Sequence, residues 1–306
     1  MSQSPPTVPV CYRHPGRETY IRCTRCDRPI CPECMRDASV GHQCPECVAE
    51  GRRTQRPVRT AFGGGAAGQR GLVTKTLLGL NVLVMILSVI SGGGEGLAGG
   101  GWGGLLGGYT PLIGWGANYG GDPELATRLS DGTIVGGIVQ GEYYRMVTSL
   151  FLHYGVLHLL MNMWALWVLG RNLEAALGPL RFLGLYLLSG LGGSVAVYYF
   201  APNALTAGAS GAIFGLFAAL FLLLRRMGRD TSAVLPVIII NIVFTFAVPG
   251  ISIAGHLGGM VVGALVGTIL AYAPREHRNL VQGVGMGAIF LLLIALTIMR
   301  TAMLSI

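Results

Sequence analysis

The chain has little charge: only 12% of its 306 residues are charged, whereas 52% are apolar. A soluble enzyme has roughly twice that charged fraction, and a nucleic-acid-binding protein gathers its basic residues on a folded domain. Here the bases, all arginine except Lys75, lie between long apolar runs. The composition therefore disfavours both classes, predicts no nucleic-acid partner and indicates a protein of the lipid bilayer.

Cysteine is lacking from most of the chain, since all seven cysteines lie between Cys11 and Cys47. An odd number, grouped in C-x-x-C pairs with histidine nearby, is typical of zinc sites rather than of disulfides. A secretory signal is lacking too, because residues 1–10 have neither a basic start nor a long apolar core. We therefore expect the cysteine-rich segment to stay in the reducing cytoplasm.

After residue 70, seven stretches with almost no charge approach the roughly 20 residues that a helix needs to cross the hydrocarbon. They are 72–91, 146–170, 182–200, 201–224, 231–249, 251–273 and 281–299. The segment 91–121 is also nearly uncharged, but about half of it is glycine, which disfavours a helix. It is expected to be a loop at the membrane surface. The fold class predicted is an all-α polytopic membrane protein.

The arginines predict the orientation. They precede the first stretch and then recur in alternate loops, at Arg171 and Arg181, Arg225, Arg226 and Arg229, and Arg275 and Arg278. Positive loops stay inside, so we expect a cytoplasmic N-terminus in a plasma or inner membrane. The 92–145 loop and the C-terminus then lie outside.

Four pairs of zinc-ligand residues share a two-residue gap, which turns both side chains of a pair toward one ion. They are Cys11/His14, Cys23/Cys26, Cys31/Cys34 and Cys44/Cys47. Eight ligands make two tetrahedral sites, and a full set of protein ligands leaves no open position for chemistry. The prediction is two structural Zn²⁺ ions, with no cofactor required for catalysis.

This pattern resembles a B-box zinc finger. The resemblance implies that alternate pairs share an ion, so that Cys11, His14, Cys31 and Cys34 form one site and Cys23, Cys26, Cys44 and Cys47 the other. Because B-boxes often end their second site in histidine, His42 stays open as a replacement for Cys44 or Cys47. We expect this zinc-binding domain to cover 1–50, to have a cytoplasmic protein partner, and to be followed by a flexible basic linker over 51–71.

Polar side chains inside membrane spans are costly and mark functional sites. The informative ones are His153, His158 and Asn162 in the second stretch, Ser210 in the fourth and His256 in the sixth. In the predicted topology these three spans all run from outside to inside, and each polar residue falls in the N-terminal half of its span or within about one turn of the middle. All five are therefore expected at one depth, near the outer face.

Ser210 and His256 suggest a nucleophile and its base. The sequence Gly208-Ala209-Ser210-Gly211 starts a predicted helix, where free backbone N–H groups can stabilise negative charge. Glycines four residues apart in both helices allow the close approach that a hydroxyl–imidazole hydrogen bond needs. Each feature alone has a plainer interpretation: a serine bonded to its own helix, glycine packing, or a histidine that relays protons or binds metal.

His158 and Asn162 are four residues apart and so lie on one helical face. Both can donate to one oxyanion. Taken in order along alternate spans, His158-x-x-x-Asn162, Gly208-x-Ser210-Gly211 and Gly255-His256-x-x-Gly259 resemble the rhomboid family of intramembrane serine proteases.

The resemblance implies a rhomboid catalytic core of six helices over 72–273, with a seventh helix over 274–306. It implies that Ser210 is the nucleophile, that His256 is the base without an acid, and that Ser210 N, His158 and Asn162 form the oxyanion hole. It also implies an aromatic ring at Phe214 against the base, and structural roles for Arg145 and Glu174. One departure is Tyr144, which stands where the family often has tryptophan.

Three functions remain. The first is a serine endopeptidase that cleaves single-span or polytopic membrane-protein substrates near the outer membrane face. The alternative is a catalytically silent rhomboid-like protein that binds membrane clients, but inactive relatives lack the serine, the histidine or both, and this chain retains Ser210 and His256. A transporter or metal carrier would need carboxylates within its spans, and only Glu174 lies at the edge of one.

Overall fold

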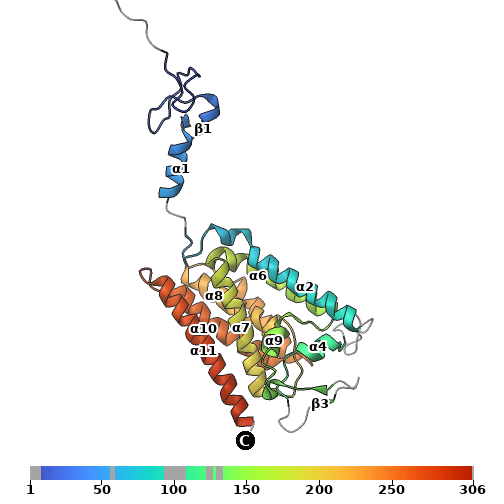
Figure 1. Cartoon of the computed structure of the whole chain (residues 1–306). Helices are drawn as coiled ribbons and strands as arrows, with labels where there is room; N and C mark the ends of the chain where they lie inside the picture. The colour runs from blue at the N-terminus through green and yellow to red at the C-terminus, as the bar shows by residue number, and fades with distance from the viewer. Residues whose placement is uncertain (1–7, 56–58, 93–107, 122–126, 129–133, 305–306) are drawn as a thin grey trace, which may run out of the picture. The chain divides into compact units, whose positions relative to one another are not determined.

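The computed structural model describes residues 8–55, 59–92, 108–121, 127–128 and 134–304 (Figure 1). The chain forms two compact units, Met1–Val58 and Arg59–Ile306. Each is described by itself.

The first unit is small and built of short elements. They are η1 (Pro32–Cys34), β1 (Arg36–Asp37), β2 (His42–Gln43) and α1 (Pro45–Thr54), with β1 and β2 paired antiparallel. Its buried core consists of Ile30 and cysteines. So small an apolar core cannot stabilise a domain without help from disulfides or metal, which fits the metal sites predicted for this unit.

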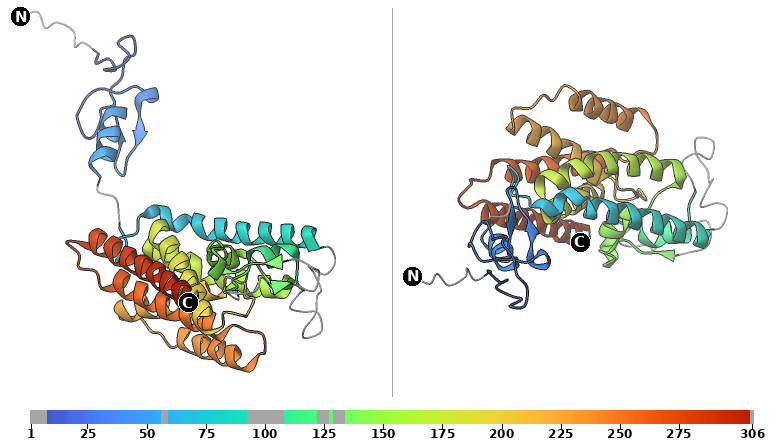
Figure 2. Two further views of the ribbon diagram at one scale, coloured as in Figure 1. Left: turned by 60° about the horizontal axis from the view of Figure 1, so that its bottom comes forward. Right: turned by 90° about the horizontal axis from the view of Figure 1, so that it is seen from above.

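The second unit is a bundle of apolar helices. They are α2 (Leu72–Gly92), α6 (Gly155–Leu177), α7 (Pro179–Phe200), α8 (Ser210–Arg226), α9 (Val234–Ala247), α10 (Ile253–Tyr272) and α11 (Arg278–Leu304). Shorter elements are η2 (Ala66–Arg70), α4 (Pro111–Gly116), β3 (Thr127–Arg128), β4 (Ile134–Val135), η4 (Ile138–Gln140), α5 (Arg145–Thr148) and η5 (Ser149–Phe151). Helices α7, α8 and α10 pack most closely with one another, α2 lies on α6, and α11 lies on α7 and α10 (Figures 1 and 2).

The predicted fold class is confirmed: within the described residues the bundle is helical, apolar and long enough to cross a membrane repeatedly. Four helices, or five with a bent pair, have spanning length and composition. Two of the seven predicted stretches form helices shorter than about 20 residues, since α8 has 17 residues and α9 has 14.

Two of the predicted boundaries also differ. The span expected at 146–170 is broken, since the chain bends by 89° between Arg145–Phe151 and Gly155–Leu177. The span expected at 201–224 begins only at Ser210. The preceding residues are held out of the helix by an antiparallel bridge in which Asn118 and Thr206 exchange backbone hydrogen bonds of 2.8 and 2.9 Å. Of the loop expected over 91–121, residues 93–107 lie outside the described residues.

The linker expected to be flexible over 51–71 differs from a free tether. Its first residues continue α1 to Thr54, and from residue 59 the chain belongs to the second unit. Thr60 Oγ1 donates to the carbonyl of Ala176 at the end of α6, Gly63 O accepts from Arg181 at 3.1 Å, and Phe62 is buried. Apolar and hydrogen-bonding groups therefore anchor the part nearest the membrane helices.

A buried carboxylate joins α6 to α2. Glu174 accepts hydrogen bonds from the backbone N–H groups of Val73 at 3.0 Å and Thr74 at 2.8 Å, and from the Thr74 hydroxyl at 2.7 Å. The first N–H groups of a helix lack partners within it, and they favour negative charge. Glu174 therefore caps α2 from a neighbouring helix.

Candidate active site and metal sites

Ser210 is the first residue of α8 and is half-buried. The turn before it requires glycine: Gly208 has a φ of +137°, and a Cβ there would lie 2.9 Å from Cε1 of His158. The sharp turn ends the extended segment and starts the helix at the serine. Its hydroxyl therefore lies beside the first N–H groups of α8, which have no acceptor within the helix.

His256 lies in the first turn of α10, one turn after Ser252, whose hydroxyl caps the helix by accepting from Gly255 N at 3.1 Å. Its Nε2 is 2.8 Å from Ser210 Oγ. The ring stacks on Phe214, with centroids 4.1 Å apart and planes 21° apart. Ser210 and Phe214 on α8 and His256 on α10 thus hold the imidazole against the serine hydroxyl.

Glycines make this approach of α8 and α10 possible. A Cβ on Gly259 would lie 2.0 Å from the Gly211 carbonyl oxygen, and one on Gly263 would lie 2.2 Å from Gly215 Cα. Helices carrying side chains at these positions would be held further apart. The glycine spacing that predicted a close crossing therefore corresponds to one.

His158 also lies near Ser210, since a Cβ built on Gly208 would be 3.0 Å from His158 Nε2 and 3.6 Å from Ser210 Oγ. Its Nδ1 accepts from Tyr154 N at 3.3 Å, which leaves the proton of the neutral ring on Nε2, on the side of Gly208. Asn162 is buried one turn later and its amide donates to His158 O at 3.0 Å. Among the described contacts, Asn162 does not reach Ser210.

His153 is buried and its ring meets that of His158 edge-on, with centroids 5.0 Å apart. A small cavity of about 40 Å³ lies beside Ser210 and His256, with Ser149 and Ser194 among its lining residues. A cavity of that size and polarity has room for water. The site therefore combines a hydroxyl, an imidazole, N–H donors and space for water.

One residue at this site escaped the sequence analysis. Thr245 of α9 is buried, and its Oγ1 is 2.8 Å from Nδ1 of His256. The signal available was a lone hydroxyl in an apolar helix, but nothing in the sequence says which face of α9 turns toward α10.

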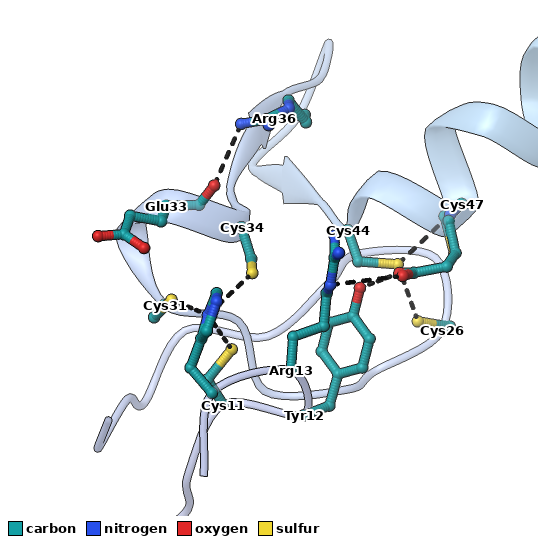
Figure 3. Close-up of polar contacts among 12 residues, drawn as sticks. Cys11, Tyr12, Arg13, Cys26, Cys31, Glu33, Cys34, Arg36, Cys44 and Cys47 are labelled. Atoms are coloured by element: carbon teal, nitrogen blue, oxygen red, sulfur yellow. Dashed lines mark hydrogen bonds and ion pairs between the residues drawn. The ribbon is translucent and has the colours of Figure 1, made fainter. Parts of the chain in front are cut away.

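The eight predicted zinc ligands form two groups in the first unit, Cys11, His14, Cys31 and Cys34 in one and Cys23, Cys26, Cys44 and Cys47 in the other. Within each group the ligand atoms lie within 4.8 Å of one another. Figure 3 shows the sulfurs of Cys11, Cys31 and Cys34 turned toward one point, and those of Cys26 and Cys44 facing each other. His42 is in neither group; its Nδ1 is 3.4 Å from an oxygen of Asp37.

The donor chemistry of these groups fits a thiophilic divalent cation. Burial raises the pKa of Cys11, but backbone N–H donors, that of Cys31 foremost, outweigh it and lower the pKa to about 6. The pKa of Cys34 is raised to about 11 by burial and by the neighbouring Cys11 and Cys31 sulfurs. Thiolates this close repel one another, and a bound cation removes that repulsion. Both groups could hold metal ions.

Comparison with known proteins gives a consistent result. The Rhomboid domain family matches residues 140–273, which include Ser210, His256, His158 and Asn162. Rhomboid protease GluP of Bacillus subtilis (strain 168) is 42% identical over 134 residues, or 41% of this chain and 26% of GluP. RHOMBOID-like protein 6, mitochondrial, of Arabidopsis thaliana is 33% identical over 154 residues, which cover 46% of this chain and 50% of that protein.

The chain therefore spans half or less of these two relatives. A third, putative rhomboid protease YdcA of Bacillus subtilis (strain 168), is 34% identical over 148 residues and is covered over 74% of its length. With helices long and apolar enough to span a bilayer repeatedly, a serine and a histidine paired across two of the helices of the bundle, and this extent of similarity, the chain belongs to the rhomboid family.

Proposed function

We propose that this protein is an intramembrane serine endopeptidase that uses a Ser210–His256 dyad. The observation that carries the proposal is the 2.8 Å contact between Ser210 Oγ and His256 Nε2, made inside a bundle of apolar helices. Hydrogen-bond reach between nucleophile and base is the geometric requirement for activating a hydroxyl.

In the proposed reaction, the Ser210 oxygen attacks the carbonyl carbon of a peptide bond as its proton passes to His256 Nε2. The tetrahedral intermediate collapses with rupture of the C–N bond, and the imidazolium returns the proton to the leaving amine. Water, for which the cavity beside Ser210 offers space, then attacks the acyl carbon and gives a proton to His256. The acyl C–O bond breaks, and the imidazolium returns that proton to Ser210 Oγ. The histidine is neutral again after each half-reaction.

The oxyanion is assigned to the Ser210 N–H, with His158 and Asn162 as further donors. Support for His158 is the direction of its Nε2–H, described above. Support for Asn162 is its position one turn from His158 on the same face; its amide has to leave His158 O to donate to the oxyanion. Preorganised donors of this kind lower the barrier because they need no reorientation as charge develops.

The substrates proposed are membrane proteins that are cut in or next to a transmembrane segment. The reason is that a substrate must come among the membrane helices to reach the dyad. By the distribution of arginine, we propose that the N-terminus is cytoplasmic and that the site opens toward the outer face. We further propose that the first unit binds two structural zinc ions and takes a cytoplasmic protein partner.

Co-expression with a panel of single-span membrane proteins tests the proposal. Wild type is expected to release a fragment that Ser210→Ala does not release. If wild type and Ser210→Ala leave every substrate intact while both bind the same clients, the protein is a membrane-client binder and the protease assignment is wrong.

A further inference from the structure

Both ring nitrogens of His256 are engaged, each by a hydroxyl from a different helix. Nε2 is 2.8 Å from Ser210 Oγ of α8, and Nδ1 is 2.8 Å from Thr245 Oγ1 of α9. The dyad thus continues into a third group, the Thr245 hydroxyl, on the far side of the base.

The number of protons available determines the direction of these hydrogen bonds. A threonine hydroxyl has one proton, and Thr245 Oγ1 is 2.8 Å from the Asn241 carbonyl oxygen, which can only accept. If Thr245 donates to Asn241, its oxygen must accept from Nδ1–H. The proton of a neutral imidazole is then on Nδ1, and the Nε2 lone pair faces Ser210.

The opposite direction leaves the Ser210 proton without an acceptor in the protein, so that water in the adjacent cavity would have to accept it. If Thr245 donated to Nδ1, Nε2 would carry the proton and donate to Ser210, whose own hydroxyl proton would need another acceptor. Among the described residues, no other side-chain hydrogen bond of Ser210 occurs. The first direction satisfies every donor and is also the one that a general base requires.

The placement of Thr245 is unusual for its helix. The structure describes all 14 residues of α9, and within them Thr245 alone is buried. Its neighbours Val243, Phe244 and Phe246 are exposed, as suits side chains that face lipid, and Figure 2 shows α9, in orange, at the edge of the bundle. A polar side chain is the only one that α9 buries, and it is buried against His256.

Stacking on Phe214 does not determine the rotation or the tautomer of His256. A ring stacked on the imidazole fixes the plane of His256, but it leaves the ring free to rotate within that plane and does not select a tautomer. Hydrogen bonds at both nitrogens fix rotation and tautomer together. We propose, resting on the serine-protease function above, that Thr245 is a positioning residue that holds His256 in its Nδ1–H tautomer with Nε2 toward Ser210.

Three variants test this. Thr245→Val keeps the shape of the side chain and removes the hydroxyl, whereas Thr245→Ser keeps the hydroxyl. Because the buried Nδ1–H loses its acceptor, we expect Thr245→Val to lower kcat about ten- to hundredfold with little change in KM. Thr245→Ser should stay within about threefold of wild type. Thr268→Val is the matched control, since Thr268 makes the same bond to its own helix, with Ala264 O at 2.8 Å, but is exposed.

The tautomer itself gives a readout that does not depend on proteolysis. In protein labelled with ¹⁵N-histidine, with the His256 signals identified by their loss in His256→Ala, wild type, Thr245→Ser and Thr268→Val should show a protonated Nδ1 and a bare Nε2. Thr245→Val should gain the Nε2–H form. An unchanged tautomer in Thr245→Val, or equal loss of activity in the Val and Ser variants, would overturn the positioning role. If no variant cleaves any substrate, the tautomer measurement still decides for or against Thr245, whereas the protease function alone fails.

Discussion

Gly259 of α10 lies against Gly211 of α8 so closely that a Cβ on Gly259 would be 2.0 Å from the Gly211 carbonyl oxygen. Gly211 follows Ser210, and Gly259 lies one turn after His256. The distance between the two proposed reacting side chains is therefore set by two residues that have no side chain.

Gly259→Ala is expected to separate α8 from α10. The backbone oxygen that the new methyl group meets cannot move alone, and forcing extra atoms into a packed core typically costs about 1–3 kcal/mol. Both thermal stability in detergent and reaction of Ser210 with inhibitors should fall. Gly287→Ala on α11 is the control, because a Cβ there has nothing within 4 Å, and it should match wild type. Normal inhibitor reaction in Gly259→Ala would show that the crossing does not set the dyad.

A fluorophosphonate or isocoumarin is expected to label Ser210 covalently. The hydroxyl is a weak nucleophile without its base, so His256→Ala should suppress the labelling and Ser210→Ala should abolish it. His277→Ala, in an exposed loop, should be labelled as wild type. Mass spectrometry of the peptide containing Ser210 provides the measurement. Undiminished labelling of folded His256→Ala would remove His256 as the base.

Loss of one oxyanion donor typically lowers kcat by about 10²–10³. We expect His158→Ala and Asn162→Ala each to approach this loss while retaining measurable activity, since other donors remain. Asn172→Ala is the matched control: Asn172 also lies on α6 and donates to the carbonyl four residues earlier, at 2.7 Å, but it is exposed. If Asn162→Ala cleaves several substrates as wild type does, its amide does not serve the oxyanion.

Elemental analysis of the full chain should find two zinc ions per molecule. Cys31→Ser is expected to lose one of them, whereas His42→Ala should keep both because His42 lies outside the ligand groups. Structural zinc typically contributes about 10–16 kcal/mol to small domains, so a chelator should unfold the first unit while the helical unit stays folded. Zinc content that is unaffected by Cys31→Ser would contradict the ligand grouping.

Two shortened chains separate the metal domain from the helical unit. A chain that begins at Arg59 keeps Thr60, Phe62 and Gly63 and their contacts with α6, α7 and α11, so it should match the thermal stability of the full chain and still cleave. A chain that begins at Leu72 lacks these contacts and should melt at a lower temperature. If the Arg59 chain is folded but inactive, the first unit regulates the site and is not separable.

Much of this architecture follows from residue patterns. Uncharged stretches predicted where most of the helices lie. The two-residue spacing predicted the pairs of ligands in the first unit, and the resemblance to a B-box implied which pairs meet. Ser210 and His256 are in hydrogen-bond contact, whereas the common depth expected of His153, His158, Asn162, Ser210 and His256 stays a prediction. These features are local, or repeat with a period that the sequence displays.

The features that sequence could not predict depend on contacts between distant segments. The extended course of the residues before Gly208 depends on a backbone bridge from Asn118 to Thr206, and an apolar run gives no sign of such a bridge. The contacts that hold residues 60–63 are made with Ala176, Arg181 and Gln282, which come much later in the chain. Thr245 is separated from His256 by a loop, and its burial depends on how α9 rotates, which periodicity in a uniformly apolar helix does not show.

The cap that Glu174 places on α2 implies an order of assembly. The capped amide of Thr74 lies 100 residues before the carboxylate, so during synthesis α2 emerges long before its cap exists. At about 5–20 residues per second, the delay is roughly 5–20 s. Throughout that interval the first N–H groups of α2 lack the Glu174 acceptor and have to bond to water or to other groups in their place. The contact that caps the start of α2 therefore forms only after the end of α6 has been made, so the earliest of these helices is completed late.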